Sequence, residues 1–294
     1  MTVIVREGPG FVVERSDEGD TLVSVGSWSA EAGDLLDTGQ VEGLDLNYAK
    51  GFKDTDLAFL RPWPIRRLSV LSRTSNDVSP IYRLSETLET LSIQCASSVQ
   101  VDLRNLPCLQ SLSAGWAQVS SSIGDALGLR DLYLGSYGER DLSPLRWNTQ
   151  LERLRLKDRP RTQTLDGIEF LPRIEHLGVF GAPIEDIGPL GRLERLSELH
   201  LQSCRVRDLG PIAKLSGLRV LNMSEGGEID SVSSIESTQR LEMLWLFGTT
   251  RVVDDDLGPI ARLPRLRDLR MKARRSYRPS VDLIQAQIEA RKPG

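Results

Sequence analysis

The sequence has few of the residues that cross-link small secreted domains or equip metal sites. It contains 3 cysteines and 2 histidines, and aromatic residues make up 5% of its 294 positions. Cys95, Cys108 and Cys204 are odd in number and show no Cys-x-x-Cys spacing, which argues against a disulfide framework and against a cysteine metal site. We therefore expect them to be small apolar side chains in a reducing compartment.

Long apolar runs and a strong net charge are missing as well. No segment approaches the roughly 20 apolar residues of a membrane-spanning helix, and the first ten residues hold no basic segment followed by an apolar one. Because the formal net charge is only -4, no overall field favours nucleic acid or an anionic membrane as a partner. We expect a soluble, cytoplasmic protein, and the excess of arginine over lysine is typical of a bacterium with a GC-rich genome.

What the sequence does contain is one phrase repeated eleven times. The phrase is an apolar residue, two variable residues, a leucine, one variable residue and another apolar residue, as in Leu151–Leu156 and Leu196–Leu201. The copies begin at Val41, Ile65, Leu88, Leu109, Leu129, Leu151, Ile174, Leu196, Leu218, Leu241 and Leu266. Successive copies start between 20 and 25 residues apart, so the chain is expected to be a stacked array of short repeats.

Each phrase predicts one short strand. Its fourth and sixth positions are apolar and alternate with variable positions, which is the period-two pattern of a strand with one buried face. Because all copies run in the same direction along the chain, we expect the strands to stack in parallel, about 4.8 Å apart. The variable third, fifth and seventh positions then face outward.

The segments that return the chain to the next strand share a second pattern, which reads aspartate, apolar residue, glycine or serine, proline and apolar residue. Its copies are Asp141–Leu145, Asp186–Leu190, Asp208–Ile212 and Asp256–Ile260. Aspartate caps a helical turn, and proline is tolerated at its first positions. The pattern predicts a 3-10 or single-turn helix, after which Leu193, Leu215 and Leu263 should point inward.

The strand phrase and the Asp-apolar-x-Pro-apolar-x-x-Leu return together resemble the short-repeat leucine-rich proteins, which include the bacterial internalins and the eukaryotic phosphatase-regulator type. The resemblance covers about residues 41–275. It implies an α/β solenoid, a right-handed curved array with a parallel β-ladder on the concave face and short 3-10, helical or loop returns on the convex face.

One departure from this family concerns the residue three positions beyond the last strand leucine. The family usually has asparagine or cysteine there, which bonds the backbone of neighbouring turns. Cys204 and Thr249 fit this role. The residues that do not fit it are Ala96, Ala117, Tyr137, Arg159, Ala182 and Gly226. Less regular turns are expected at those positions.

Both ends of a repeat array need covers, because a terminal repeat otherwise exposes an apolar face. Residues 1–40 contain three strand-like segments, Thr2–Val5, Phe11–Val13 and Thr21–Val25, and are expected to form an amino-terminal β cap. Residues 276–294 contain apolar residues at helical spacing after Ser280 and are expected to form a helical cap. With the array over 41–275, we expect one structural unit overall.

Motifs of catalysis or cofactor binding are missing. The sequence has no Walker-type glycine loop, no Gly-x-Ser-x-Gly and no His-Glu-x-x-His. No catalytic, cofactor-binding or metal-binding residue is therefore assigned. His176, Glu198 and His200 fall on adjacent strands, and such a set binds metal or moves protons in some proteins. The favoured interpretation is that they are polar contact residues, with a metal-dependent enzyme as an alternative.

The outward positions predict a binding surface. Large apolar groups at Phe180, Trp245 and Phe247 have no evident folding role, and aromatic residues and arginine dominate many interfaces. Trp116 and Tyr137 follow their strands near the same rim. The alternative is that the aromatic residues pack on each other as a local cover. The candidate partner-binding residues are Tyr133, Arg153, Arg155, Lys157, His176, Phe180, Glu198, His200, Met243, Trp245, Phe247 and Arg270.

Positive charge is concentrated in two places. Arg153, Arg155 and Lys157 form a stripe that suits an acidic partner surface, and a solvated stripe neutralised by Asp131 and Asp158 is the alternative. A second basic region comprises Arg265, Arg267, Arg270, Lys272, Arg274, Arg275 and Arg278. It carries the alternative of a nucleic-acid-associated protein, although Asp254–Asp256 lie one turn away and few stacking aromatics accompany it.

The preferred hypothesis is a non-catalytic, monomeric scaffold that binds a partner protein on the concave face. Trp245 and Phe247 would serve as apolar anchors, and an inhibitor or immunity role is one specialisation of this class. No cofactor and no membrane association are expected. The identity of the partner cannot be read from outward positions, which define only the chemistry of the surface.

Overall fold

The computed structural model describes residues 2–291. The chain packs into two compact units, residues 1–132 and 133–294. This division falls inside the array of repeats, whereas the boundaries expected from the sequence lie at its two caps. In an array each repeat packs mainly on its neighbours, so no single core marks where one part ends.

Each of the eleven phrases forms a strand that begins at the third residue of the phrase. The first unit contains β4 (Gly43–Asn47), β5 (Arg67–Leu71), β6 (Thr90–Gln94) and β7 (Ser111–Gly115). The second unit contains β9 (Arg153–Lys157), β10 (His176–Val179), β11 (Glu198–His200), β12 (Val220–Asn222), β14 (Met243–Leu246) and β16 (Asp268–Met271), and β8 (Asp131–Gly135) spans the boundary. Within each unit these strands pair in parallel with their neighbours, which confirms the predicted ladder.

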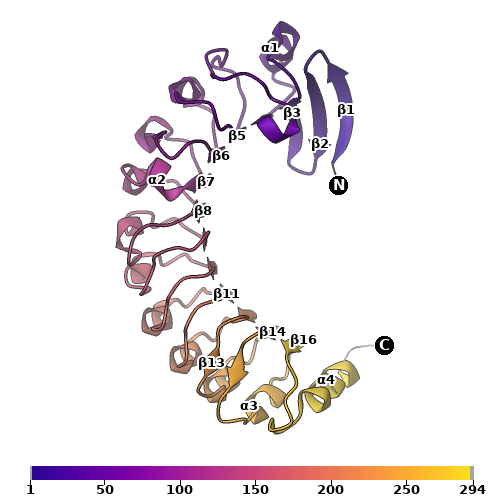
Figure 1. Cartoon of the computed structure of the whole chain (residues 1–294), viewed down its shortest axis with the longest axis vertical. Coiled ribbons are helices and arrows are strands. Elements are labelled where there is room, and N and C mark those ends of the chain that lie inside the picture. The colour runs from indigo at the N-terminus through magenta and orange to yellow at the C-terminus, as the bar shows by residue number, and fades with distance from the viewer. Residues whose placement is uncertain (1, 292–294) are drawn as a thin grey trace. The chain divides into compact units, whose positions relative to one another are not determined.

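The core of each unit is built from the fourth and sixth positions of the phrase. Leu154, Leu156, Leu199 and Leu201 are each 0% exposed, and burial of such a side chain stabilises the fold by about 1.5–3 kcal/mol. In each unit the strands lie on one side and the helical turns on the other (Figure 1). Because side chains of a strand alternate between its faces, the third, fifth and seventh positions point away from the turns. We call this surface the strand face.

Short helical turns close the repeats, as the aspartate and proline pattern predicts. The aspartate accepts a hydrogen bond of 2.7–2.8 Å from the backbone N–H two residues further on, which belongs to Ser143, Gly188, Gly210 or Gly258. The turns are η5 (Ser143–Leu145), η7 (Gly188–Arg192), η8 (Gly210–Lys214) and α3 (Gly258–Ala261). The predicted inward residues Leu193, Leu215 and Leu263 are buried.

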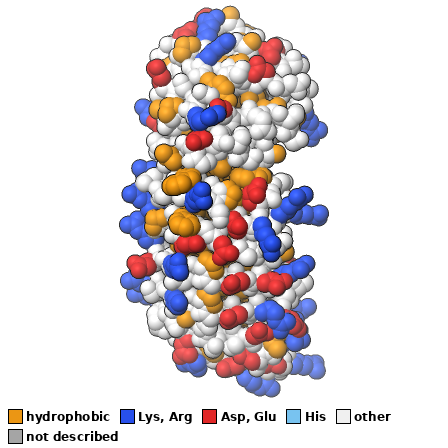
Figure 2. All heavy atoms as spheres, turned by 90° about the vertical axis from the view of Figure 1, so that its left-hand side faces the viewer, with side chains coloured by type: hydrophobic (Ala, Val, Ile, Leu, Met, Phe, Trp, Pro, Cys, Tyr) orange, Lys and Arg blue, Asp and Glu red, His pale blue; other side chains and the backbone are white. Residues whose placement is uncertain are grey.

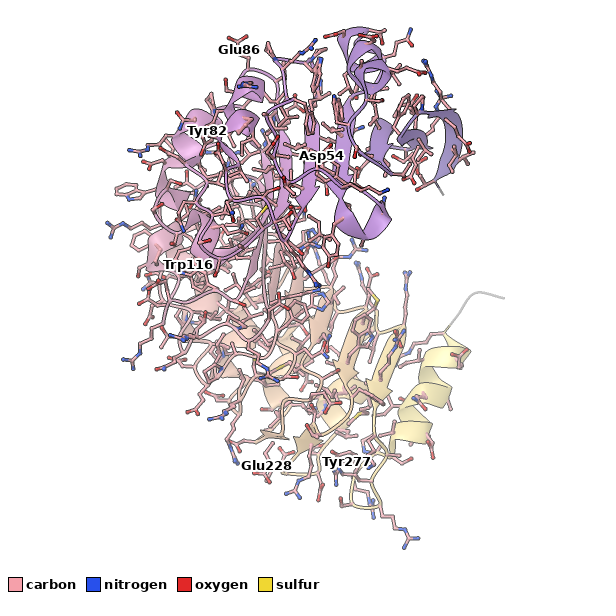
Figure 3. The ribbon with its side chains drawn as sticks, turned by 45° about the horizontal axis from the view of Figure 1, so that its top comes forward. Asp54, Tyr82, Glu86, Trp116, Glu228 and Tyr277 are labelled. Atoms are coloured by element: carbon pink, nitrogen blue, oxygen red, sulfur yellow. The ribbon has the colours of Figure 1, made fainter. Side chains whose placement is uncertain are left out.

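Other return segments contain further short elements. They are η1 (Tyr48–Lys50), η2 (Ser79–Leu84), η3 (Leu103–Asn105), α2 (Trp116–Val119), η4 (Ile123–Asp125), η6 (Ile168–Phe170) and η9 (Ser233–Ser237), with β13 (Glu228–Ile229) and β15 (Arg251–Val252) paired in parallel. The hydroxyls of two tyrosines, Tyr82 and Tyr277 (labelled in Figure 3), tie such segments together. Tyr82 accepts from the backbone N–H of Asp102 at 2.7 Å, and Tyr277 accepts from that of Val252 at 3.1 Å.

The turns after six consecutive strands share one backbone feature, although they differ elsewhere, because Arg159 and Gly227 also have positive φ values, 58° and 79°. The eighth position of each phrase adopts a left-handed backbone, with φ between 53° and 78°. These residues are Ser136, Asp158, Gly181, Ser203, Glu225 and Gly248. The left-handed residue lets the chain turn at the same place after each of these strands.

Two side chains still act as ladder residues, one of them shifted from the predicted position. Cys204 is buried, and its thiol lies 3.6 Å from the carbonyl oxygen of Val179. Thr249 was predicted for the same role but is exposed. Its neighbour Thr250 is buried and donates to the carbonyl of Met223 at 2.7 Å. The prediction was wrong by one residue, because the period of the repeats varies.

The amino-terminal cap is a three-stranded sheet, as expected. β1 (Val3–Gly8), β2 (Phe11–Ser16) and β3 (Gly19–Ser24) pair in antiparallel order. β3 also pairs with β4, in parallel, and so joins the cap to the ladder. A helix that we did not expect, α1 (Ala30–Asp37), follows the sheet. The side chain of Ser29 caps it by accepting from the backbone N–H of Ala32 at 3.2 Å, so the sequence did carry its signal.

The carboxy-terminal cap contains the predicted helix, α4 (Val281–Ala290), capped by the Ser280 side chain through the N–H of Leu283. The last three residues of the expected cap, 292–294, lie outside the described residues. Within residues 2–291, no helix has the length and apolar character required to span a membrane.

Candidate binding surface on the strand face

The strand face of the second unit arranges its side chains in rows across the strands. The third position supplies Arg153, His176, Glu198, Val220, Met243 and Asp268, in register. The fifth position supplies Arg155, Gly178, His200, Asn222, Trp245 and Arg270. The seventh position supplies Lys157, Phe180, Gln202, Ser224, Phe247 and Lys272. Tyr133 is the first residue of this unit, so all twelve candidate partner-binding residues lie in it.

The basic stripe is joined to the aromatic residues. Arg153 and Arg155 are exposed, whereas Lys157 is half-buried. The ammonium of Lys157 lies 5.8 Å from the ring centre of Tyr133 and 5.0 Å from that of Phe180. Both distances are within the range of a cation–π attraction. Lys157 is therefore a packed part of the surface and not a freely solvated charge.

Phe180 and His200 extend this cluster across the next two strands. The ring of Phe180 lies over Gly178, where an added Cβ would come within 2.7 Å of it. The His200 ring is 6.3 Å from Phe180 and 6.1 Å from Trp245, measured between ring centres. The glycine thus makes room for the aromatic ring on the strand face.

Trp245 is held from several sides and is half-buried. Its indole N–H donates to the Asp268 carboxylate at 3.0 Å, and the guanidinium of Arg270 lies 4.9 Å from its ring centre. On the β12 strand beside it, the outward side chain of Asn222 is only 7% exposed. The alternative weighed from the sequence, a local cover made by packed side chains, therefore describes Trp245 well.

Phe247 differs from its neighbours, because 61% of the residue is exposed. It follows β14 at the seventh position, on the same face as Trp245. Met243, at the third position, is half-buried. Of the two apolar anchors proposed from the sequence, Phe247 is the one whose ring is available to a partner.

The two histidines share one carboxylate. Nδ1 of His176 lies 3.0 Å from Oε2 of Glu198, and Nε2 of His200 lies 3.9 Å from the same oxygen. Burial lowers the pKa of His200, and the nearby Glu198 carboxylate only partly opposes this. Among residues 2–291, no group of three or more His, Cys, Asp or Glu side chains is placed to hold a metal ion. That part of the chain therefore offers no set of ligands for the metal-dependent enzyme considered as an alternative.

The lowered pKa of His200 gives a pH prediction. In the folded protein its pKa lies below the ordinary histidine value of about 6.5, so the unfolded state binds the proton more readily. Stability should be unaffected by this group above about pH 7 and should fall as the pH drops through 6.5. His200→Gln should show a smaller fall in urea midpoint between pH 7.5 and pH 5.5 than the wild type. An equal fall in both proteins would contradict the prediction.

The second basic region is partly engaged within the protein. Arg270 pairs with Asp268 at 3.0 Å, and a guanidinium nitrogen of Arg278 donates to the carbonyls of Arg275 and Tyr277, both at 2.8 Å. The exposed members of this region include Arg265, Arg267, Lys272 and Arg275.

Two exposed aromatic residues on the opposite side were missed from the sequence. Trp147 is 60% exposed and Phe170 51% exposed, and each lies four residues before a phrase. Later repeats place Arg192 and Lys214 at this position, so a comparison of repeats in register would have found them. Apolar side chains lie among charges of both signs on the side formed by the turns (Figure 2).

The two aromatic residues expected near the rim of the strand face are instead buried. Trp116 is 8% exposed and Tyr137 is 0% exposed. The Tyr137 hydroxyl donates to the carbonyl of Asp141 at 2.9 Å, and burial raises its pKa. Both belong to the core because the chain turns inward as soon as the strand ends.

No protein-family model matches the chain, and no curated protein matches it in sequence. Solved structures do match. Internalin InlF of Listeria monocytogenes has a TM-score of 0.65 at 20% identity, over 90% of this chain and 86% of that one. A leucine-rich repeat protein of Leptospira interrogans has a TM-score of 0.61 at 16% identity, over 88% and 73%. TLR13, in complex with ssRNA13, has a TM-score of 0.54 at 17% identity, over 84% and 42%.

Proposed function

We propose that this chain, which has the leucine-rich repeat fold, is a non-catalytic protein that binds a partner protein on the strand face of its second unit. Repeat arrays present extended surfaces whose outward residues do not contribute to the hydrophobic core. The observation that carries the proposal is the exposed Phe247, set at the edge of a packed aromatic and cationic cluster.

The chemistry of the cluster defines the partner surface it would suit. Trp245 and Phe180 are fixed by their neighbours, so little side-chain entropy is lost when they are covered. Phe247 would enter an apolar pocket of the partner, and Arg153 and Arg155 would face its acidic groups. A soluble, cytoplasmic, monomeric protein with an inhibitor or immunity role is the specialisation we propose within this class.

The first experiment identifies the partner. Affinity purification of the tagged chain from its native cells, followed by mass spectrometry, should recover a protein that Phe247→Ala recovers poorly. If nucleic acid were the main partner, a gel shift at low salt should instead depend on Arg265, Arg267 and Lys272, with steep salt dependence.

Phe247→Ala should weaken binding of the identified partner by about 30-fold, the effect of removing a hot-spot aromatic residue worth about 2 kcal/mol. Its urea midpoint should not change, because the ring is mostly exposed. Phe170→Ala is the matched control, since it removes an exposed phenylalanine from the side of the turns. Calorimetry that gives equal affinities for wild type and Phe247→Ala would remove Phe247 as the anchor.

A further inference from the structure

Both histidines of the chain lie on the strand face of the second unit, on adjacent strands. His176 is directly opposite Glu198 in the strand register, and His200 is opposite Gly178. His200 therefore belongs to the fifth-position row, which continues across β12 to Trp245. A side chain that titrates near neutral pH thus lies within the surface proposed to bind a partner.

The ring of His200 is partly enclosed by aromatic neighbours. Its centre lies 6.3 Å from that of Phe180 and 6.1 Å from that of Trp245, and 23% of its side chain is exposed. An interface of ordinary size buries about 800 Å² on each partner and spans several strands that are about 4.8 Å apart. A partner anchored on Phe247 would therefore also cover His200. Because a charged imidazole loses its water when it is covered, the covered state favours neutral His200.

The charges around His200 also disfavour a proton on it. The charged or titratable side chains on the strands around it are Arg153, Arg155 and Lys157 from β9, His176 from β10, Glu198 from β11 itself, and Asp268 and Arg270 from β16. Lys157 lies 5.0 Å from the ring centre of Phe180, and Arg270 lies 4.9 Å from that of Trp245, so each cation contacts a ring that flanks His200. The Asp268 carboxylate already pairs with Arg270 at 3.0 Å. A protonated His200 would thus add a positive charge to a surface that is already cationic.

The carboxylate of Glu198 is the group that would stabilise a charged His200, but it lies closer to the other histidine. Its Oε2 is 3.0 Å from Nδ1 of His176 and 3.9 Å from Nε2 of His200. Burial lowers the pKa of His200, Glu198 partly opposes this, and the charge of His176 lowers that pKa further. His176 therefore competes with His200 for the same carboxylate oxygen.

We propose that partner binding on the strand face is switched by pH, with neutral His200 required for binding and His176 drawing Glu198 away from it. This inference rests on the proposed function, because it concerns the same surface. At pH 7.5 His200 is neutral and the aromatic row accepts the partner. As the pH falls below about 6.5, a proton on His200 places an imidazolium beneath the partner, and the complex weakens.

An NMR titration of the imidazole C–H signals tests the switch on the full chain without a partner. The chain has 2 histidines, so His176→Ala assigns both sets of signals. We expect the pKa of His200 to lie below the ordinary value of about 6.5 in the wild type and to rise in His176→Ala, since Glu198 then turns to His200. Glu198→Gln, which keeps the side-chain size, should lower it. An ordinary or raised pKa for His200 in the wild type, or no rise in His176→Ala, would overturn the proposal.

Calorimetry with the partner recovered by affinity purification tests the effect on binding. We expect the Kd of the wild type to rise about three- to tenfold between pH 7.5 and pH 5.5, because His200 must release its proton on binding. His200→Gln should lose most of this dependence, whereas the matched control His176→Ala, which removes the other histidine, should keep it.

The two proposals fail in different ways. The same pH dependence in wild type and His200→Gln, or tighter binding by the wild type at pH 5.5, would overturn the switch even if Phe247→Ala weakens binding as expected. A Phe247→Ala protein that binds like the wild type contradicts the anchor of the proposed function instead. The histidine titration decides whether the proton-sensitive group exists, whichever partner is recovered.

Discussion

Leu199→Ala is expected to lower the free energy of unfolding by about 2–5 kcal/mol. Leu199 is 0% exposed at the fourth position of its phrase, on the central strand β11 of the second unit. Its side chain packs between two neighbouring repeats, which are held apart by their own strand backbones. The surrounding structure cannot collapse into the space, so a cavity term adds to the loss of apolar burial.

Urea denaturation followed by circular dichroism measures this effect, with Leu283→Ala as the matched control. Leu283 is 51% exposed on α4, and both leucine and alanine favour helices. We expect this variant to change stability by no more than about 0.5 kcal/mol. A Leu199→Ala protein as stable as the control would show that the strand leucines do not form the core.

Gly167→Ala is expected to destabilise the protein by about 2–5 kcal/mol, for two separate reasons. The residue has φ of 96°, a conformation that costs other residues about 1–2 kcal/mol. A Cβ there would also come within 2.5 Å of the backbone nitrogen of Ser143 and 2.6 Å of the carbonyl carbon of Leu142. Moving backbone to relieve such a contact adds about 1–3 kcal/mol.

Gly181→Ala separates these two reasons. Gly181 has φ of 78°, but a Cβ there would meet no atom within 4 Å. We expect it to lose only the conformational part, about 1–2 kcal/mol. Thermal or urea unfolding of both variants tests the difference. If Gly181→Ala lost as much stability as Gly167→Ala, the close approach of the η5 turn to Gly167 would have no energetic role.

The arrangement of the strand face was only partly predictable. The phrase placed Phe180, Trp245 and Phe247 on the outward side, and the structure has them there. It could not show that Trp245 would be held by Asp268 and Arg270 while Phe247 stays exposed. Exposure depends on the size of side chains on neighbouring strands, and those neighbours are more than 20 residues away in the chain.

The sequence by itself determined the strands, their direction and their buried side, because leucine spacing fixes which face of each strand leaves water and the repeat fixes which strand is next. Two caps and the turns of the aspartate and proline pattern followed from equally local rules. The tertiary structure alone decided which outward side chains remain available and which pack on each other. Those properties arise from contacts between repeats, whose side chains meet only after the array has stacked.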